Sequence, residues 1–538
     1  GGVFVTCAPD IFYLKDTTGD GIADLRKVVL TGFNDTKTSQ IRMGTPTLGL
    51  DGWVYVTGGL NGGSITSPLY PDRDAVSYTT ADGRFHPDTF EFQATGGKSQ
   101  FGLTINPYGD RFGSSNRHPV QHIVLEPWYL DRNKHLNFSE SVKYVSRVES
   151  NALVFPISDI AITADFMPKL IGRSHKGTFT AAGGILAFHG TGLTPAHQGN
   201  IFICEPAQNL VQRQVLHQEM ASYTSDLAYE GKEFLASSDT WFNPVFLQLG
   251  PEGALYLADM HRKVIDHPSY IPEQARNQMD FESGKNKGRI YRITRMDFDA
   301  STRVDVDTMT PTGQLVSALE SPEEWIRSTA HRLLLERSDL SSLASIKSCA
   351  IQAKLAESRI RALGLLGSFG ALDIKTVQTL LRDQRPEVRA QAILVAQDLF
   401  ETHPELVPAL VVTADDPSAK VRFNSALILG SLEGNEVMQA LARIAAQDGA
   451  DRWTQAAILS GIGNRVSEFT EVFRKQPVQN IEAYSAMMMY LGRLLGSTAT
   501  LAECQSFFKE VLNSKTNISV IPTLLGLAAG IESREDIS

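Results

Sequence analysis

Up to about residue 293 the apolar residues come in short runs, and Gly, Asn, Asp and Pro separate these runs. Val, Ile, Phe and Tyr dominate the runs, and no long stripe of helical period appears among them. Short β-branched and aromatic runs between turn residues are typical of strands in an all-β domain. The pattern therefore predicts β structure for the first half of the chain.

A turn glycine followed by an apolar strand with an aromatic residue recurs in this half. The copies lie at 2–5, 51–56, 108–112, 199–203 and 252–257, and their glycines are 50, 57, 90 and 54 residues apart. Repeats of about 40 to 55 residues are typical of a β-propeller, in which each repeat is one four-stranded blade. We expect a six-bladed-type propeller over residues 1–297, with its first blade incomplete. The longest interval holds either a blade with an insertion or a blade without the signature.

Beyond about Pro311 the apolar pattern changes to the helical period, and Leu, Ala, Ile and Val replace the aromatics. A motif repeats there, in which an acidic residue or Pro precedes an Arg and a small-apolar helix. The arginines Arg327, Arg361, Arg389 and Arg422 are 34, 28 and 33 residues apart, and a degraded copy begins at Asp451. Such helix pairs stack into a solenoid with a concave face. We expect a linker at 298–310 and a solenoid at 311–538, which either docks a protein or acts as a brace.

Composition narrows the choice of partners. The 538 residues carry 50 basic and 60 acidic side chains, a net charge of -10, which argues against a nucleic-acid partner. The cysteines Cys7, Cys204, Cys349 and Cys504 lie far apart and form no C-x-x-C or C-x-x-C-H motif. The chain itself therefore carries no zinc clip and no c-type haem attachment. Cys7 and Cys204 either form a disulfide or remain free thiols, and free thiols are favoured.

The most distinctive local motif is an Asp-rich loop near the start of the chain. Oxygen donors stand at alternate positions around glycines, at Asp16, Thr18, Asp20, Ile22 and Asp24. This spacing resembles a calcium-binding loop, because Ca²⁺ takes six to eight hard oxygen ligands. Lys27 stands where such a loop usually has a bidentate Glu. The alternative is an Asp-Gly turn between two strands.

A second group of polar residues crowds around short strands at 100–122. Its members are Gln100, Arg111, Asn116, Arg117 and His122. In a propeller, the inner strands and loops surround a central channel where ligands bind. The cationic and amide groups suit an anionic or polyhydroxy ligand, and His122 suits a general base. The alternative is that these residues cap turns and that His122 makes a structural hydrogen bond.

Two further groups follow. His175 lies among small residues and suits an open position at the channel mouth, or else it is an ordinary loop histidine. The last group, at strand ends, comprises Asp239, Trp241, Asp259, His261 and Arg262. A charge beside an indole ring suits a sugar or a flat cofactor, and Asp259, His261 and Arg262 bring an acid, a base and a cation together. A hydrolytic role for paired carboxylates is a weaker reading, and an Asp-ended structural strand is the alternative.

Several of these segments resemble the planctomycete-type membrane-bound dehydrogenases. The resemblance rests on Ser-Asn-Arg-His-Pro at 115–119 and on 199–207, 241–245, 250–260, 264–268 and 287–293, and it extends over the helical repeats. The chain departs from the family at Asn243, where an Arg is usual. The resemblance implies a propeller of the glucose/sorbosone dehydrogenase class followed by HEAT-like repeats. It also implies a signal peptide before the propeller and a c-type cytochrome after the repeats.

The resemblance thus implies an exported or membrane-associated quinoprotein-like dehydrogenase that oxidises a sugar or polyol. Pyrroloquinoline quinone (PQQ) and Ca²⁺ are the implied cofactors, with haem c only in a following domain. His122 or His175 is the expected base, and electrons pass to a cytochrome. The alternative is a non-catalytic propeller that binds carbohydrate or protein, with the helical repeats as a docking arm.

Overall fold

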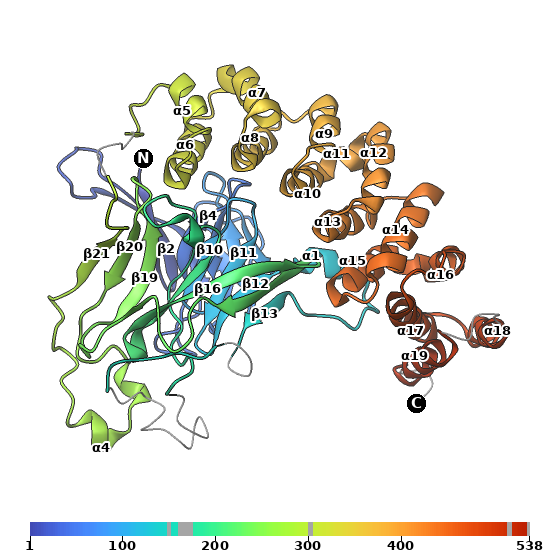
Figure 1. The fold of residues 1–538 in the computed structure, drawn as a ribbon, viewed down its shortest axis with the longest axis horizontal. Coiled ribbons are helices and arrows are strands. Elements are labelled where there is room, and N and C mark those ends of the chain that lie inside the picture. The colour runs from blue at the N-terminus through green and yellow to red at the C-terminus, as the bar shows by residue number, and fades with distance from the viewer. Residues whose placement is uncertain (148–151, 160–175, 300–304, 514–518, 535–538) are drawn as a thin grey trace. The chain divides into compact units, whose positions relative to one another are not determined.

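The computed structural model describes the whole chain except residues 148–151, 160–175, 300–304, 514–518 and 535–538. The chain forms two compact units (Figure 1). The first comprises Gly1–Ile123, Val142–Gln218 and Tyr223–Ala371, and the second comprises Val124–Ser141, Glu219–Ser222 and Leu372–Ser538. The first unit holds the sheets and the helices between residues 273 and 368, and the second is helical.

The described strands of the first unit form five antiparallel sheets. The first sheet contains, in order, β1 (Val3–Cys7), β2 (Asp10–Lys15), β3 (Leu25–Phe33), β6 (Gly63–Thr66) and β7 (Val76–Tyr78). The second contains β4 (Gly44–Leu48), β5 (Val54–Thr57), β8 (Asp82–Phe85) and β9 (Phe92–Thr95). The third contains β10 (Gly102–Ile105), β11 (Arg111–Ser115), β12 (His118–Ile123) and β13 (Val142–Ser146).

The fourth sheet contains β14 (Ile185–Ala187), β15 (Ile201–Glu205), β16 (Leu210–Glu219) and β17 (Ser222–Leu227), and β18 (Leu235–Ala236) also pairs with β16. The fifth contains β19 (Pro244–Leu249), β20 (Leu255–Asp259) and β21 (Arg289–Ile293). A short helix, α4 (Glu273–Arg276), lies between β20 and β21. The all-β prediction for this half of the chain is therefore confirmed.

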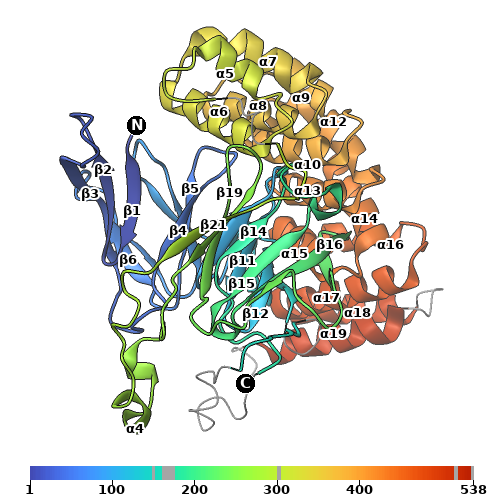
Figure 2. The same ribbon diagram turned by 60° about the vertical axis from the view of Figure 1, so that its left-hand side comes forward.

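The repeated glycine-led strand occupies one position in the sheets. It is the second strand in the later four sheets, as β5, β11, β15 and β20, and it is the edge strand β1 in the first. The first strands of the later sheets are neighbours in order, because β4 contacts β10, β10 contacts β14, and β14 contacts β19. Three of these strands, β4, β14 and β19, are labelled in Figure 2. The 90-residue interval holds no additional sheet among the described residues. It contains the long connection 124–141 between β12 and β13, which is an insertion of the kind predicted.

The apolar core lies between neighbouring sheets. Phe202 and Ile203 are consecutive in β15 and therefore point to opposite faces of the fourth sheet. Phe202 packs with Leu257 of the fifth sheet, and Ile203 packs in the same cluster as Phe112 of the third. Because both faces of the sheet are covered, β15 is apolar at successive positions instead of alternating.

The first unit also contains α5 (Thr312–Ala318), α6 (Glu324–Arg337), α7 (Leu343–Gln352) and α8 (Ala356–Ser368). These helices contact the turns that precede the glycine-led strands. The Ser368 hydroxyl donates to the carbonyl of Asp51 at 3.1 Å, and the Tyr108 hydroxyl donates to Glu357 at 3.0 Å. The compact unit therefore extends to Ala371, past the linker predicted at 298–310.

The second unit is helical. Its elements are α1 (Pro127–Leu130), α9 (Ile374–Leu380), α10 (Pro386–Val395), α11 (Gln397–Thr402), α12 (Val407–Val412), α13 (Ala419–Leu429), α14 (Asn435–Asp448), α15 (Arg452–Ile462), α16 (Val466–Arg474), α17 (Ile481–Thr498), α18 (Leu501–Leu512) and α19 (Val520–Glu532). Across both units, no described helix has the length and apolar content needed to span a membrane. All four cysteines are free thiols, and Cys7 is exposed whereas Cys204 is buried.

The repeated arginine has one structural role, which is to donate to the main-chain carbonyl six residues before it. The pairs are Arg327 with Ser321 at 2.6 Å, Arg359 with Ala353 at 2.6 Å, Arg389 with Asp383 at 2.7 Å and Arg422 with Asp416 at 2.5 Å. In the degraded copy the Gln455 amide makes this bond to Gly449. The repeat position is therefore Arg359 and not Arg361, and the spacings become 32, 30, 33 and 33. Each side chain satisfies a carbonyl that the turn between two helices leaves free.

Candidate functional site

The candidate site lies at the end of the sheets where the chain passes from one sheet to the next. We call this end the connection face. Among the described residues it comprises the connections 34–43, 96–101, 176–184 and 237–243, the turns 116–117 and 206–209, and the loop 260–288. The antiparallel order places the turns that precede the glycine-led strands at the opposite end.

Main-chain and side-chain bonds tie the third sheet to the fourth across this face. The backbone N–H of Asn116 donates to the Gln100 side-chain oxygen at 3.0 Å. The carbonyl of Asn116 in turn accepts from the N–H of Ala182 at 3.1 Å. Gln100 and Asn116, both predicted ligand contacts, therefore lie together, and both position loops.

A buried carboxylate continues this chain of bonds into the fourth sheet. Glu205 ends β15 and is fully buried, and one of its oxygens, Oε2, accepts from the N–H groups of Thr180 at 3.0 Å and Ala181 at 2.9 Å. The Thr180 hydroxyl lies 3.1 Å from the other oxygen. Burial raises the pKa of Glu205 to about 7, even though these hydrogen bonds favour the charged form.

The fifth sheet contributes an acid–histidine pair. One oxygen of Asp259 accepts from the N–H groups of Asn243 and His261, both at 2.8 Å. Its second oxygen lies 3.4 Å from Nδ1 of His261. His261 has a left-handed backbone with φ of 46°, which is uncommon for a residue other than glycine and which turns its ring back toward the acid. Asn243 also donates to the carbonyl of Pro206 at 3.3 Å, which joins this pair to the end of β15.

Cationic and aromatic groups border the acid–histidine pair. The Trp241 ring lies 5.8 Å from the His261 ring, and the N–H of Arg262 donates to the Asn243 side chain at 3.2 Å. Asp239 is exposed and accepts from the N–H of Trp241 at 3.0 Å, so it holds the Trp241 backbone in a turn. Arg117 has a buried Nε without a hydrogen-bond partner among the described residues. Arg117 lies in the turn between β11 and β12 of the third sheet, and this nitrogen is not exposed to solvent.

The loop 260–288 reaches the connection between the first and second sheets. The N–H of His267 donates to the Gln40 side chain at 3.0 Å, and the N–H of Ser39 donates to the Tyr270 hydroxyl at 3.3 Å. Segments more than 200 residues apart in sequence therefore meet on the connection face.

The remaining predicted site residues do not lie on this face. Arg111 and His122 pair with Ile123 and Phe112 at the other end of the third sheet. The Arg111 backbone thus starts at the other end, but its buried side chain lies 4.5 Å from the Tyr55 ring centroid and donates at 3.3 Å to Thr95, the last residue before the connection 96–101. His122 is buried in contact with the Phe112 ring and lies 3.7 Å from Asp110. His175 lies outside the described residues.

The Asp-rich loop lies between β2 and β3, at the end of the first sheet away from the connection 34–43. Asp16 accepts from the N–H groups of Gly19 at 2.6 Å and Gly21 at 2.7 Å, which lower its pKa. Asp20 accepts from Ile22, and Asp24 accepts from Thr17. Backbone donors thus face these carboxylates, and no group of three or more described His, Cys, Asp or Glu residues is arranged to hold a metal ion. We assign no step to calcium.

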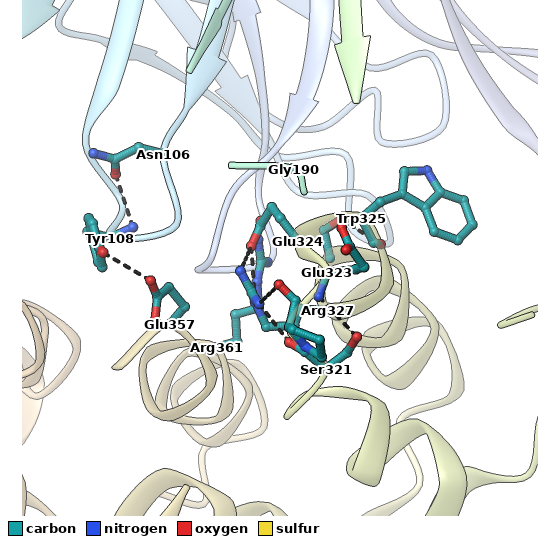
Figure 3. A network of polar contacts seen from close by, with 12 residues as sticks. Asn106, Tyr108, Gly190, Ser321, Glu323, Glu324, Trp325, Arg327, Glu357 and Arg361 are labelled. Atoms are coloured by element: carbon teal, nitrogen blue, oxygen red, sulfur yellow. Dashed lines mark hydrogen bonds and ion pairs between the residues drawn. The ribbon is translucent and has the colours of Figure 1, made fainter. Parts of the chain in front are cut away.

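A network of charged residues occupies the opposite end of the sheets (Figure 3). Glu324 of α6 accepts from Arg327 at 2.8 Å and from Arg361 of α8. Burial opposes ionisation of Glu324, but the two guanidinium groups outweigh it and lower its pKa. Nearby, Thr191 of the turn between β14 and β15 donates to Glu323. Each of these groups is paired within the first unit, so the network anchors the helices to the turns.

The prediction from sequence missed two residues that organise the connection face, Glu205 and Asn243. The signal for Glu205 was an acid at the end of an otherwise apolar strand and directly before Pro206. A charged residue in such a run is buried only when it is paired or hydrogen-bonded. Asn243 carries no comparable signal, since its role depends on the distant residues Pro206 and Asp259.

The raised pKa of Glu205 predicts a measurable dependence of stability on pH. Between pH 4.5, the ordinary pKa of a Glu side chain, and about pH 7, Glu205 is protonated in the folded protein and ionised in the unfolded chain. The contribution of Glu205 to folding stability is therefore complete below pH 4.5 and is lost as the pH rises through 7. Glu205→Gln keeps a neutral group that accepts from the two N–H groups and donates to Thr180. We expect the variant to gain about 3 kcal/mol over wild type between pH 4.5 and pH 8. Urea unfolding at several pH values measures this difference, and a pH-independent difference would contradict it.

Comparisons with known proteins give the following. No curated protein matches the chain. A solved structure titled as a crystal structure of glucose dehydrogenase matches with 16% identity and a TM-score of 0.26, covering 46% of this chain and 70% of that one. HEAT repeats match residues 374–461, which confirms the repeat class in the second unit. A family described as a domain of unknown function (DUF7133) matches residues 1–297, which is more than half of the chain, and the chain belongs to this family.

Proposed function

We propose that this chain is the catalytic part of a quinoprotein-like dehydrogenase that oxidises a sugar or polyol. One observation carries the proposal. The connection face brings an acid–histidine pair and an indole ring together at the adjoining ends of two paired strands, with the Arg262 backbone bonded to Asn243 beside them. A polar face of this kind is the default location for ligand binding in a fold built from radial sheets.

The proposal includes a propeller-type ring for the sheets. The successive contacts among β4, β10, β14 and β19 support it, as do the bonds from loop 260–288 to Gln40 and Ser39. Apolar side chains remain exposed on β1 and β21, with Val3 57% and Ile290 76% exposed. In the later sheets a strand precedes the glycine-led strand, but in the first sheet the glycine-led strand β1 is itself the edge, and no described strand pairs with its free side. We therefore place the opening of the ring between the first and fifth sheets.

His261 is the proposed base. Asp259 receives two backbone N–H bonds on one oxygen, which fix the carboxylate and turn its other oxygen toward Nδ1 of His261. A carboxylate at Nδ1 favours the tautomer that leaves Nε2 free to accept a proton, and it stabilises the imidazolium that results. We therefore propose that Nε2 of His261 accepts the proton of the substrate hydroxyl.

The residues beside this pair fit PQQ, a planar quinone that bears carboxylates. The Trp241 ring offers a flat apolar surface, and Arg262 offers positive charge. When bound, the quinone supplies the oxidant that accepts the hydride of the alcohol carbon. The chain itself binds and orients the two reactants and holds the proton. By the resemblance, we place the parent protein outside the cytoplasm and propose a c-type cytochrome as the electron acceptor.

Dye reduction by the protein supplied with PQQ, with and without Ca²⁺, across a panel of sugars and polyols tests this proposal. We expect saturable turnover that His261→Gln lowers at least about 100-fold in kcat/KM, since removal of a general base typically costs that much. His122→Gln is the matched control, because His122 lies at the other end of the third sheet, and it should keep most of the activity.

Two results would contradict the proposal. One is retention of activity by His261→Gln together with its loss in a folded His122→Gln variant. The other is saturable binding of a glycan without any dye reduction, which would instead favour a non-catalytic carbohydrate-binding protein.

A further inference from the structure

The connection between β12 and β13, residues 124–141, packs within the helical second unit. We call this segment the strap. It contains the short helix α1, which contacts α15. Its side chains Leu125, Tyr129 and Asn133 are all buried. A connection between neighbouring antiparallel strands usually needs only a few residues, so this one has a role beyond joining the two strands.

The strap places a guanidinium at the carboxyl ends of two helices. Arg132 donates to the carbonyl of Leu427 in α13 at 2.8 Å and to the Ser431 hydroxyl at 2.9 Å. Its other terminal nitrogen lies 3.3 Å from the Ser460 hydroxyl in α15. The last carbonyls of a helix lack partners within the helix and carry partial negative charge, so a cation is stabilised there.

Two glycines make room for this guanidinium. A Cβ on Gly430 would lie 3.3 Å from Nη1 of Arg132 and 2.7 Å from the Cα of Gly461. A Cβ on Gly461 would lie 2.4 Å from the Cα of Gly430. Side chains at these positions would push α13 and α15 apart at the point where Arg132 enters. The niche is therefore shaped by the helices for one flat cation.

Further contacts extend over consecutive helices. The Tyr129 hydroxyl donates to Gln397 of α11 at 2.8 Å, and the Asn133 amide donates to the carbonyl of Leu459 in α15 at 2.8 Å. Phe138 lies 5.5 Å from the Trp453 ring, edge to face. The helices thus contact an aromatic residue of the strap (Tyr129), the Arg-Asn pair three and four positions later, and a second aromatic residue (Phe138).

We infer that this face of α11, α13 and α15 is a peptide-binding surface, that the strap is its resident ligand, and that a peptide with the strap's aromatic-x-x-Arg-Asn pattern is the partner it accepts. The strap is tethered at both ends, so its effective concentration at the surface is about millimolar and it excludes a free peptide of equal affinity. This inference does not depend on the proposed dehydrogenase activity.

Fluorescence anisotropy with a labelled peptide of residues 124–141 tests the inference on the full chain. Arg132→Ala/Asn133→Ala removes the main contacts of the strap and leaves the niche intact. We expect this variant to bind the peptide at least tenfold more tightly than wild type does. A peptide with Ala at the Arg position should lose at least tenfold in affinity for the variant.

The milder variant Arg132→Lys serves if the double variant fails to fold. A Lys ammonium is one point donor and cannot join both helix ends, so the peptide should bind this variant better than wild type. A folded variant, with an unfolding midpoint near that of wild type, that binds the peptide no better than wild type would overturn the inference. Equal binding of the Arg and Ala peptides would overturn it as well.

Discussion

Glu324→Ala is expected to lower the free energy of unfolding of the first unit by about 3–5 kcal/mol, because it leaves two buried guanidinium groups without their shared carboxylate. Arg327 and Arg361 have side chains only 4% and 9% exposed, so water cannot replace Glu324. Arg327 keeps its bonds to the carbonyls of Ser321 and Pro322, whereas Arg361 loses its ion pair.

Urea unfolding followed by circular dichroism measures this loss. The exposed pair of Arg332 and Glu336 is the matched control, and Glu336→Ala should cost less than about 1 kcal/mol. The lowered pKa of Glu324 sets the sign of the pH dependence. Its stabilisation is present above 4.5 and is lost as pH falls, so wild type and Glu324→Ala should converge in acid. A loss below 1 kcal/mol at pH 7 would contradict the anchoring role of the network.

Arg422→Ala is expected to destabilise the second unit by about 3–5 kcal/mol for a related reason. Arg422 makes two parallel bonds to Asp448, at 2.6 Å and 2.8 Å, and both side chains are at most 5% exposed. The substitution leaves Asp448 buried without its partner and also frees the carbonyl of Asp416.

A double variant separates the cost of the stranded charge from the value of the pair. Arg422→Met/Asp448→Leu should recover most of the loss, since an apolar pair replaces a buried ion pair at little net cost. Arg443→Ala breaks a more exposed pair with Asp415 and should cost less than about 1 kcal/mol. If Arg422→Ala unfolds at the wild-type urea midpoint, the arginine at the repeat position does not stabilise the stack.

The elements that sequence predicts well are those set by local pattern. The glycine-led strands are found as β1, β5, β11, β15 and β20, because a turn glycine and an apolar run are readable without knowledge of distant residues. Before β5, β11, β15 and β20 this glycine has the left-handed backbone that glycine favours. The helical repeat was equally clear, but its register was not. Arg359 and Arg361 lie two residues apart on one helix. The structure tells them apart, because Arg359 bonds to the Ala353 carbonyl as the other repeat arginines do, whereas Arg361 bonds to Glu324 of another helix.

The sequence indicated which residue types form the candidate site, but it did not indicate which of the predicted residues lie together. Asp259, His261 and Trp241 were predicted from local spacing and lie together, since β19 begins beside the end of β20, where Pro244 pairs with Asp259. His122 was a plausible base by residue type, yet β12 places it in the core among aromatic rings. Which end of a strand a residue occupies depends on the sheet register, and sequence spacing does not give that register.

Long-range partners account for what the sequence pattern missed. The strap 124–141 has no helical stripe or repeat of its own, and its contacts with Leu427 and Leu459 span about 300 positions in the chain. The helices α5–α8 carry the repeat pattern, yet they form one compact unit with the sheets because Tyr108 and Thr191 bond to them.

Titration of the protein with PQQ, followed by tryptophan fluorescence, tests most directly whether the connection face binds the ligand. Trp241 lies on this face, and Trp325 lies on α6 at the other end of the sheets. We predict saturable quenching that Trp241→Phe removes and Trp325→Phe leaves unchanged. Quenching that survives in Trp241→Phe and disappears in Trp325→Phe, or no saturable quenching at all, would contradict this account.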